Sequence, residues 1–420
     1  MQELISKIEK LIKPFYNEKY NSEKIDYNSV PLAAPMYDER EAISGIKTIL
    51  SGWISQGRNV NLFEKAFSNY IGCKNGIAVN SGSSANLLAL LALKEKYNLQ
   101  TGDEVIIPAA TFATVAMPIL QVGLVPIYVD VSIQTLNIDP QLIENAISSK
   151  TKIIMPVHTL GYPADMDSIV KIAKKYKLLI LEDCCEAHGS SINGKKVGSF
   201  GDIAAFSFFV AHNMTTGEGG MILTDDLDLY DICRSMREFG RISYNPEVED
   251  RYYTDKKLIE YDKRYVFSRL GYNVRMTDIL AAFGIEQLKK LDMMNTKRRQ
   301  NAEWLRNEII NSFENYFFIP NEEAGYYHTF YTFPIILKES APFMRNDLAK
   351  FFESRDIETR PLFAGCLPDQ PAFKKAKGRI SESLNNSEFL KNRLIFIGIH
   401  PRLEIRHLEY VLDSIHDFIK

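Results

Sequence analysis

The strongest constraint on the fold is a run of short apolar segments that alternate with helix-forming segments from about residue 75 onward. Five mostly apolar segments are typical of strands: 76–80, 103–108, 125–130, 152–157 and 177–183. Between them, the segments 83–97, 140–149 and 164–176 have the length and apolar spacing of helices. Buried strands separated by helices predict a mainly parallel sheet covered on both faces. Ligands bind such sheets at the carboxyl ends of the strands.

The rest of the chain predicts a mixed sheet and a second domain. The segments 202–209 and 219–226 follow each other without a long helix between them, so part of the sheet is expected to be antiparallel. We predict an N-terminal helical extension over residues 1–30, a large α/β domain over 31–290 and a smaller C-terminal α/β domain over 291–420.

Composition argues against two classes of partner. The formal net charge is -3 and the basic residues are scattered, so we expect no nucleic-acid partner. The apolar runs are shorter than the ~20 residues that span a bilayer, and the first residues lack the apolar core of a signal peptide. A cytoplasmic protein without a membrane partner is therefore expected. The 5 cysteines show no CxxC spacing, which favours reduced thiols and no metal site.

Three segments that follow predicted strands hold the candidate binding residues. In 80–86, Gly82 permits a close backbone approach, and two serines at a helix N-terminus suit a phosphate, although a capped helix without ligand fits equally well. Asp183 ends a buried strand, where its carboxylate needs a partner such as a protonated pyridine nitrogen; a helix N-cap is the alternative. Phe112 can stack on a planar cofactor or belong to the core.

In this order, the segments 80–86, 111–114, 182–189, 206–220 and 271–277 resemble the DegT/DnrJ/EryC1/StrS family of sugar aminotransferases. The resemblance runs from about residue 52 to the C-terminus. It implies a fold type I pyridoxal-phosphate-dependent transferase, similar to aspartate aminotransferase, that acts on a nucleotide-linked keto sugar. It also implies a homodimer with a shared active site.

The resemblance further implies which residues bind the cofactor. The phosphate is expected at Gly82, Ser83 and Ser207, with a backbone contact from Ser84. Asp183 is expected to pair with the pyridine nitrogen, Phe112 to stack on the ring, and Glu186 to stand near the ring hydroxyl, where most members have glutamine. Asn273 is expected to reach the phosphate of the neighbouring subunit.

One position departs from the ordinary members of the family. They have a lysine that forms a Schiff base with the cofactor, and this chain has His212 there. An imidazole cannot form that bond but can move a proton. The substitution resembles the nucleotide-sugar 3-dehydratases that make 3,6-dideoxyhexoses, for example for lipopolysaccharide O-antigens. It implies non-covalently bound pyridoxal or pyridoxamine phosphate, with His212 as the base for loss of the carbon 3 hydroxyl. An aminotransferase that works with histidine and a catalytically silent family member remain open alternatives.

The cysteines distinguish two kinds of dehydratase. The kind with a [2Fe-2S] cluster has further ligands 58, 60 and 68 positions after its first cysteine; counted from Cys185, these positions are Ser243, Asn245 and Tyr253. No iron–sulfur cluster is therefore expected, because such clusters need several thiolates. The remaining kind obtains its amino group from L-glutamate. That resemblance favours GDP-4-keto-6-deoxymannose as substrate over a CDP-linked sugar.

Four further residues concern the substrate side. Asn213 and Cys366 differ from the residues that the dehydratases have there. Arg360 is a candidate for the glutamate carboxylate or the substrate diphosphate, with a surface salt bridge as the alternative. His328 is a second candidate substrate residue, with a core position as the alternative.

Overall fold

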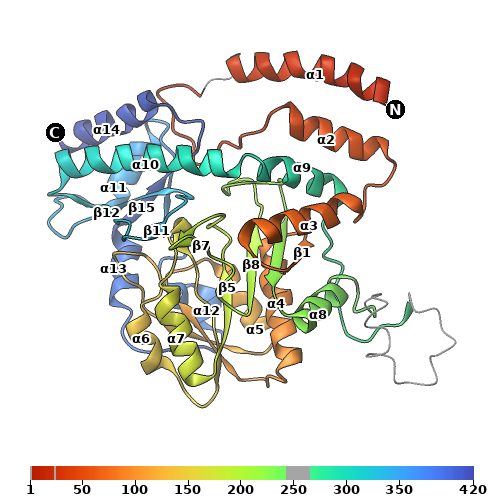
Figure 1. The fold of residues 1–420 in the computed structure, drawn as a ribbon. Helices are drawn as coiled ribbons and strands as arrows, with labels where there is room; N and C mark the ends of the chain where they lie inside the picture. Colours follow the sequence, from red (N-terminus) through yellow and green to blue (C-terminus); the bar gives the residue numbers. More distant parts are fainter. Residues whose placement is uncertain (1, 23–24, 243–264) are drawn as a thin grey trace.

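The computed structural model describes residues 2–22, 25–242 and 265–420, and its central element is an eight-stranded sheet (Figure 1). In spatial order the strands are β1 (Asn75–Val79), β9 (Gly220–Thr224), β8 (Ile203–Ser207), β5 (Leu179–Asp183), β4 (Thr151–Ile154), β2 (Glu104–Pro108), β3 (Val125–Val129) and β14 (Arg379–Ile380). β9 runs antiparallel to both of its neighbours, and the other pairs are parallel. The predicted mainly parallel, mixed sheet is confirmed.

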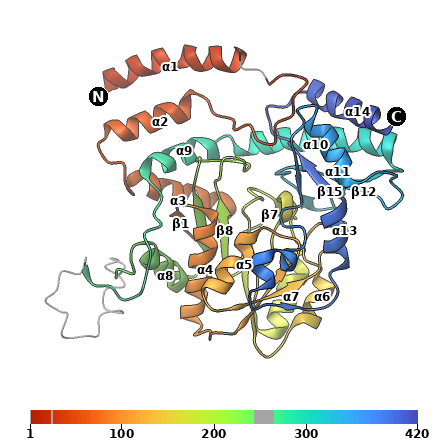
Figure 2. The same ribbon diagram turned by 180° about the vertical axis from the view of Figure 1, so that it is seen from behind.

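Helices cover both faces of this sheet, because successive strand residues point to opposite sides. On β1, Ile77 and Val79 belong to the core under α4 (Gly82–Lys96), α5 (Ala113–Gln121) and α8 (Leu227–Arg237). Ala78 faces the other side, which α3 (Arg58–Ile71), α6 (Pro140–Ala146) and α7 (Met166–Tyr176) cover. Figure 1 shows α3, α6 and α7 in front of the sheet, and Figure 2 shows α4, α5 and α8 from behind. Burial on both faces explains why these strands are apolar throughout.

The C-terminal part has the predicted smaller α/β character, and its sheet is antiparallel. Its order is β10 (Phe317–Phe318), β12 (Phe333–Leu337), β15 (Leu394–Ile397) and β13 (Thr359–Pro361). The helices around it are α10 (Leu291–Phe313), α11 (Arg345–Glu353), α13 (Asn385–Arg393) and α14 (Ile405–Ile419). α9 (Asp278–Leu288) and α10 connect the two parts (Figure 1).

Contacts between distant segments cross the predicted domain limits. Val30 forms a bridge with Ile357 and lies in the core of the small domain. β14 joins the edge of the large sheet, and the short α12 (Pro371–Lys374) places Phe373 in the large-domain core. A three-stranded sheet pairs β11 (Tyr326–Tyr327) with β6 (Ser191–Ile192) and β7 (Lys195–Lys196). The domains at 31–290 and 291–420 thus share strands and core residues.

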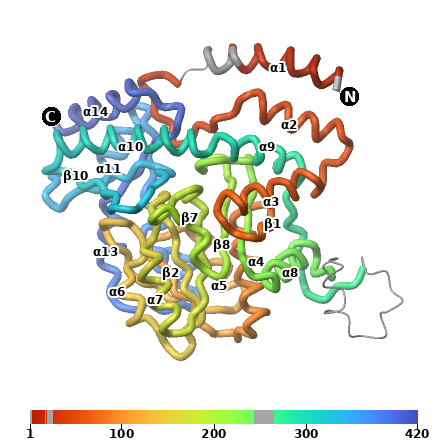
Figure 3. Tube along the Cα trace, viewed as in Figure 1, coloured from red at the N-terminus to blue at the C-terminus, as the bar shows by residue number. Residues whose placement is uncertain are grey.

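The N-terminal segment is helical, as its sequence predicts. α1 (Gln2–Ser22) runs beside α2 (Glu39–Leu50) in Figure 3, and Lys47 Nζ lies 3.0 Å from Glu9 Oε1. Within the residues that the structure describes, no helix combines the length and the apolar character required to cross a membrane.

Candidate active site

A pocket of about 300 Å³ opens at the carboxyl ends of β5 and β8 and the N-terminus of α4. It brings together seven predicted site residues that are far apart in the sequence: Gly82, Ser83, Phe112, Asp183, Glu186, Ser207 and His212. The other residues that line it are Ser81, Thr111, Thr114, Val115, Val157, Cys185, Phe209, Glu218, Tyr331 and Phe363. This is the edge at which a parallel sheet is expected to bind its ligand.

One end of the pocket is suited to a phosphate. Gly82 begins α4 directly against Ser207 at the end of β8, so closely that a Cβ on Gly82 would lie 2.5 Å from Ser207 Cβ. The first backbone N–H groups of a helix point outward and favour an anion. The expected backbone contact from Ser84 to the phosphate is not supported. Ser84 does not line the pocket, and its N–H donates to Oγ of the N-cap residue Ser81. The N-cap therefore uses the contact that we expected from Ser84.

Gly82→Ala should close this phosphate end. Overpacking of this kind costs about 1–3 kcal/mol, which corresponds to roughly 10- to 100-fold weaker binding of pyridoxal phosphate. Titration of the apoprotein, followed by cofactor absorbance, measures the change. Pyridoxal without phosphate is the control ligand and should lose far less affinity. Equal losses for the two ligands would show that the glycine does not serve the phosphate.

Asp183 is a buried carboxylate in the pocket lining. Its Oδ2 accepts a hydrogen bond from Asn86 Nδ2 at 2.8 Å, and its Oδ1 accepts one from the N–H of Cys185 at 3.1 Å. Among the described residues no cationic side chain forms an ion pair with Asp183. A buried carboxylate oriented in this way favours a cationic group of a ligand as its partner.

An aromatic side chain of the pocket wall is open to a ligand. Phe112 is the N-cap residue of α5, and its side chain is 54% exposed although it lies in the pocket wall. Its ring is nearly perpendicular to that of Phe363, at 6.0 Å between centroids. Because Phe112 is more than half exposed, its ring is open to stacking.

Glu186 is a pocket carboxyl that stays protonated at neutral pH. Its Oε2 accepts the N–H of Leu160 at 2.6 Å. Burial, together with the charge of Asp183, raises the pKa of Glu186 to about 8 despite that hydrogen bond. Glu186 can therefore donate a hydrogen bond where a glutamine amide would also donate one.

The raised pKa of Glu186 predicts a pH dependence of stability. The ordinary pKa is 4.5, so between pH 4.5 and about 8 the unfolded chain releases a proton that the folded protein retains. Wild-type stability then falls as the pH rises through this window. Glu186→Gln removes this loss. Between pH 4.5 and 8, the free energy of unfolding of the variant apoprotein should therefore rise by ~2 kcal/mol relative to that of wild type. This value is kept low because Glu186 borders the solvent-filled pocket.

Urea unfolding of the two apoproteins at pH 4.5, 6 and 8 measures this gain. Glu218→Gln is the matched control, because it makes the same change at an exposed residue of the same pocket. Parallel stability curves for wild type and Glu186→Gln would mean that Glu186 is ionised at neutral pH.

His212 stands in the loop between β8 and β9, where its side chain joins the pocket wall. The N–H of His212 donates to the carbonyl of Phe209 at 3.0 Å. Burial, with His188 and Arg298 nearby, holds the pKa of His212 well below its usual value, so the imidazole is neutral at pH 7. Nδ1 of His212 is buried without a partner among the described residues. The geometry provides a neutral base at the pocket.

The two unusual residues do not face this pocket. Asn213 Nδ2 donates to Asn295 Oδ1 at 3.1 Å and to the carbonyl of Thr329 at 3.0 Å, so it ties the His212 loop to the neighbouring segments. Cys366 is buried in the large-domain core, where burial raises the pKa of its thiol to about 12. We expected both residues on the substrate side of the site, but neither lines this pocket.

Besides Ser84, three predicted residues lie outside the pocket lining. Asn273 is exposed, and its Oδ1 accepts a hydrogen bond from Arg275 Nε at 3.1 Å. The side chain of Arg360 is exposed on β13 and lies 3.9 Å from Glu353, as a weak surface pair. The prediction that His328 contacts the substrate is corrected, because this residue is buried. Its ring stacks on Phe330 at 3.7 Å between centroids, and its Nε2 is 3.0 Å from the carbonyl oxygen of Leu160. His328 belongs to the core and is closed to a substrate.

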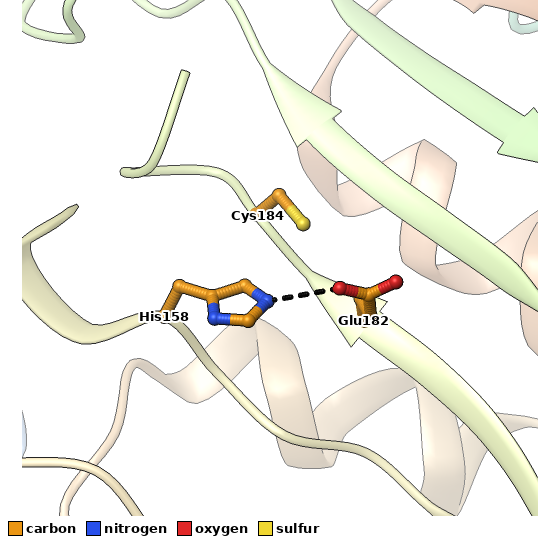
Figure 4. A group of neighbouring side chains, drawn as sticks. All are labelled: His158, Glu182 and Cys184. Carbon is orange, nitrogen blue, oxygen red and sulfur yellow. Dashed lines mark hydrogen bonds and ion pairs between the residues drawn. The ribbon is translucent and has the colours of Figure 1, made fainter. Parts of the chain in front are cut away.

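The possible metal ligands of the described residues include one buried group, His158, Glu182 and Cys184 (Figure 4). His158 Nδ1 accepts the N–H of Ala164, so its Nε2 carries the proton toward Glu182 at 3.2 Å. Glu182 also accepts backbone N–H groups from residues 198, 200 and 201. This saturated network orders the loop after β7. For the cluster ligands, Cys185 borders the pocket, whereas positions 243, 245 and 253 lie outside the described residues.

Sequence reasoning did not identify Tyr331 and Phe363, which the small domain contributes to the pocket. No local motif marks them, because each follows or precedes a short strand of the other sheet. The N–H of Tyr331 donates to the carbonyl of Leu160 at 2.9 Å, and this contact brings the two domains together at the site.

The residues of the pocket fit a pyridine ring with a phosphate group. The close approach of Gly82 to Ser207 leaves helix N–H groups for the phosphate, and the ring of Phe112 is exposed in the pocket wall. The buried carboxylate of Asp183 provides a counter-charge for a protonated ring nitrogen. Pyridoxal phosphate has these three features.

Comparisons with known proteins show which family this chain is similar to. The model of the DegT/DnrJ/EryC1/StrS aminotransferase family matches residues 36–416. The lipopolysaccharide biosynthesis protein RfbH of Salmonella typhimurium is 38% identical over 401 residues, 93% of this chain and 91% of RfbH. A dTDP-4-dehydro-2,6-dideoxy-D-glucose 3-dehydratase of Saccharopolyspora spinosa is 36% identical over 417 residues, 96% of this chain and 90% of that enzyme. A solved GDP-4-keto-6-deoxymannose-3-dehydratase, with a trapped PLP-glutamate geminal diamine, has a TM-score of 0.84 at 31% identity and covers 92% of this chain and 100% of its own.

Proposed function

We propose that this chain, which belongs to the DegT/DnrJ/EryC1/StrS aminotransferase family, is a 3-dehydratase of a nucleotide-linked 4-keto-6-deoxyhexose. The observation that carries the proposal is His212: a neutral imidazole faces the pocket at the position where an ordinary member has its lysine. The fold alone would not distinguish the two activities. Among the relatives, a GDP-sugar and a dTDP-sugar 3-dehydratase support the same reaction class.

In the proposed reaction, the residues of the pocket have separate roles. Pyridoxamine phosphate, when bound, supplies the amino group that reacts with the keto sugar and the conjugated ring that accepts an electron pair. Gly82, Ser83 and Ser207 hold its phosphate, and Asp183 keeps the ring nitrogen protonated. Nε2 of His212 takes a proton at the reacting carbon and holds it while the carbon 3 hydroxyl departs.

Because His212 cannot bond covalently to the cofactor, we propose that both cofactor forms are held non-covalently. L-Glutamate is the proposed amino donor, which the glutamate adduct of the solved relative supports. GDP-4-keto-6-deoxymannose is the proposed substrate; the dTDP-linked substrate in the name of the second relative makes the nucleotide the first variable to test. We also propose a homodimer, in which the exposed Asn273 reaches the phosphate of the neighbouring subunit.

The stoichiometry of the products tests this function. Loss of one oxygen from the sugar, driven by glutamate, releases one 2-oxoglutarate and one ammonia for each deoxygenated sugar. We would incubate the protein with pyridoxal phosphate, glutamate and GDP-4-keto-6-deoxymannose, and measure the sugar mass, 2-oxoglutarate and ammonia. The dTDP- and CDP-linked sugars would be assayed beside it. Equal amounts of all three products would support the dehydratase.

A second candidate is an aminotransferase, the activity for which the family is named. It would transfer the nitrogen to the sugar, so 2-oxoglutarate would form without ammonia and the sugar would gain an amino group. That result would replace the dehydratase proposal. No reaction with any of the three nucleotides would point to a silent family member.

A further inference from the structure

Tyr331 is a polar group of the pocket for which the cofactor contacts leave no role. It comes from the small domain, beside Phe363, and of these two only Tyr331 has a hydrogen-bonding side chain. No hydrogen bond within the described part of the chain uses its hydroxyl. Half-buried tyrosines usually find a partner for that group. Because that hydroxyl is not among the buried groups without a partner, it is open to water or to a ligand in the pocket.

The position of Tyr331 is fixed on both sides. Its N–H donates to the carbonyl of Leu160 at 2.9 Å, and its own carbonyl accepts from Arg298 Nη1 at 2.9 Å. Leu160 has a positive φ of 54° and also donates its N–H to Glu186. The backbone of Leu160 is thus hydrogen-bonded to both Tyr331 and Glu186, a degree of order that suits a precise contact.

The neighbours of Tyr331 define what its hydroxyl can reach. The ring centroid of Tyr331 lies 5.2 Å from that of His212, the proposed base. Burial and the nearby Glu186 raise the pKa of Tyr331, so the phenol remains a neutral donor throughout the physiological pH range. In the proposed reaction, the oxygen that leaves is on the carbon adjacent to the one joined to the cofactor. A donor beside the base is therefore well placed for that oxygen.

We propose that Tyr331 is a further catalytic residue, whose hydroxyl donates a hydrogen bond to the departing carbon 3 hydroxyl of the sugar. The proposal rests on the proposed function. As the C3–O bond breaks, its electron pair stays on the oxygen, and the proton held on Nε2 of His212 completes a water molecule. Tyr331 holds that oxygen toward His212 and keeps its own proton, so it returns unchanged.

Binding without turnover tests the contact. In the pyridoxal phosphate form without glutamate, no amino group is present to react with the sugar. Calorimetry would compare the GDP-linked 4-keto-6-deoxy sugar with the same sugar lacking the carbon 3 hydroxyl. One hydrogen bond is worth about tenfold in affinity at most. We expect wild type to prefer the hydroxylated sugar by about that factor, and Tyr331→Phe to bind both equally.

Tyr128 offers the matched control. It is another phenol whose buried hydroxyl has no partner among the described residues, but it lies on β3 away from the pocket lining. Tyr128→Phe should keep the wild-type preference. The assignment is overturned if Tyr331→Phe also keeps this preference. It is overturned as well if the variant loses affinity for both sugars, or for the cofactor, to the same extent. An amino-sugar product would instead refute the proposed function, while the binding comparison would still decide whether Tyr331 touches the hydroxyl.

Discussion

We expect His212→Lys to bond covalently to pyridoxal phosphate, whereas the wild type holds the cofactor without a bond. His212 lies in the pocket wall, and a lysine there would place an amine next to the cofactor carbonyl. The wild-type imidazole has no such amine. The measurement is the mass of the protein after borohydride treatment, with the visible absorbance of the bound cofactor as a second signal.

The same substitution should abolish the dehydration. A general base contributes about 100- to 10,000-fold to a rate, so loss of the imidazole predicts at least ~100-fold slower release of ammonia. His212→Asn is the matched variant: it should lose the dehydration equally but remain free of any covalent adduct. A folded His212→Lys protein with no adduct would contradict the position of the cofactor, and a fully active His212→Asn would contradict the base.

Asp183→Asn should remove most of the cofactor affinity. The carboxylate is buried, receives only neutral hydrogen bonds from Asn86 and Cys185, and is the proposed partner of the charged ring nitrogen. Leaving a buried charge without its partner costs about 3–5 kcal/mol, which predicts roughly 100-fold or weaker binding of pyridoxal phosphate. Equilibrium dialysis of the apoprotein with the cofactor measures the loss.

Asp202 provides the control for this variant. Its carboxylate accepts the N–H of Ile180 at 2.7 Å. This contact lies at the amino-terminal ends of β5 and β8, outside the pocket lining. Asp202→Asn therefore removes a hydrogen-bonded carboxylate from the same strands without touching the site. Cofactor binding should be unchanged in Asp202→Asn. Equal losses of cofactor affinity in both variants would indicate a weakened sheet. An unchanged affinity in Asp183→Asn would contradict the proposed pairing of this carboxylate with the ring nitrogen.

Local patterns accounted for most of the sheet and for one side of the pocket. The strands β1 to β5 are apolar on both faces because helices cover both faces, and that requirement is visible in each segment by itself. Asp183 and Ser207 end β5 and β8, and Gly82 stands three positions after the end of β1. Since parallel strands align their carboxyl ends, the strand ends already predicted that these residues would meet.

Contacts between distant segments decided the remainder. Ser84 was expected at the phosphate, but the N-cap Ser81 takes its N–H, a choice that depends on backbone angles at the start of α4. His328 was a candidate for the substrate, but packing on Phe330 buries it. The pairing of β14 with the large sheet likewise joins residues more than two hundred and fifty positions apart.

The wall that faces the substrate shows this division most clearly. His212 could be recognised in the sequence because it replaces one residue within a local motif. Tyr331 could not, because its place beside His212 depends on the small domain packing against the turn at Leu160. Strand periodicity and helix capping act over a few residues and can be read locally, whereas a pocket between two domains exists only after their surfaces have met.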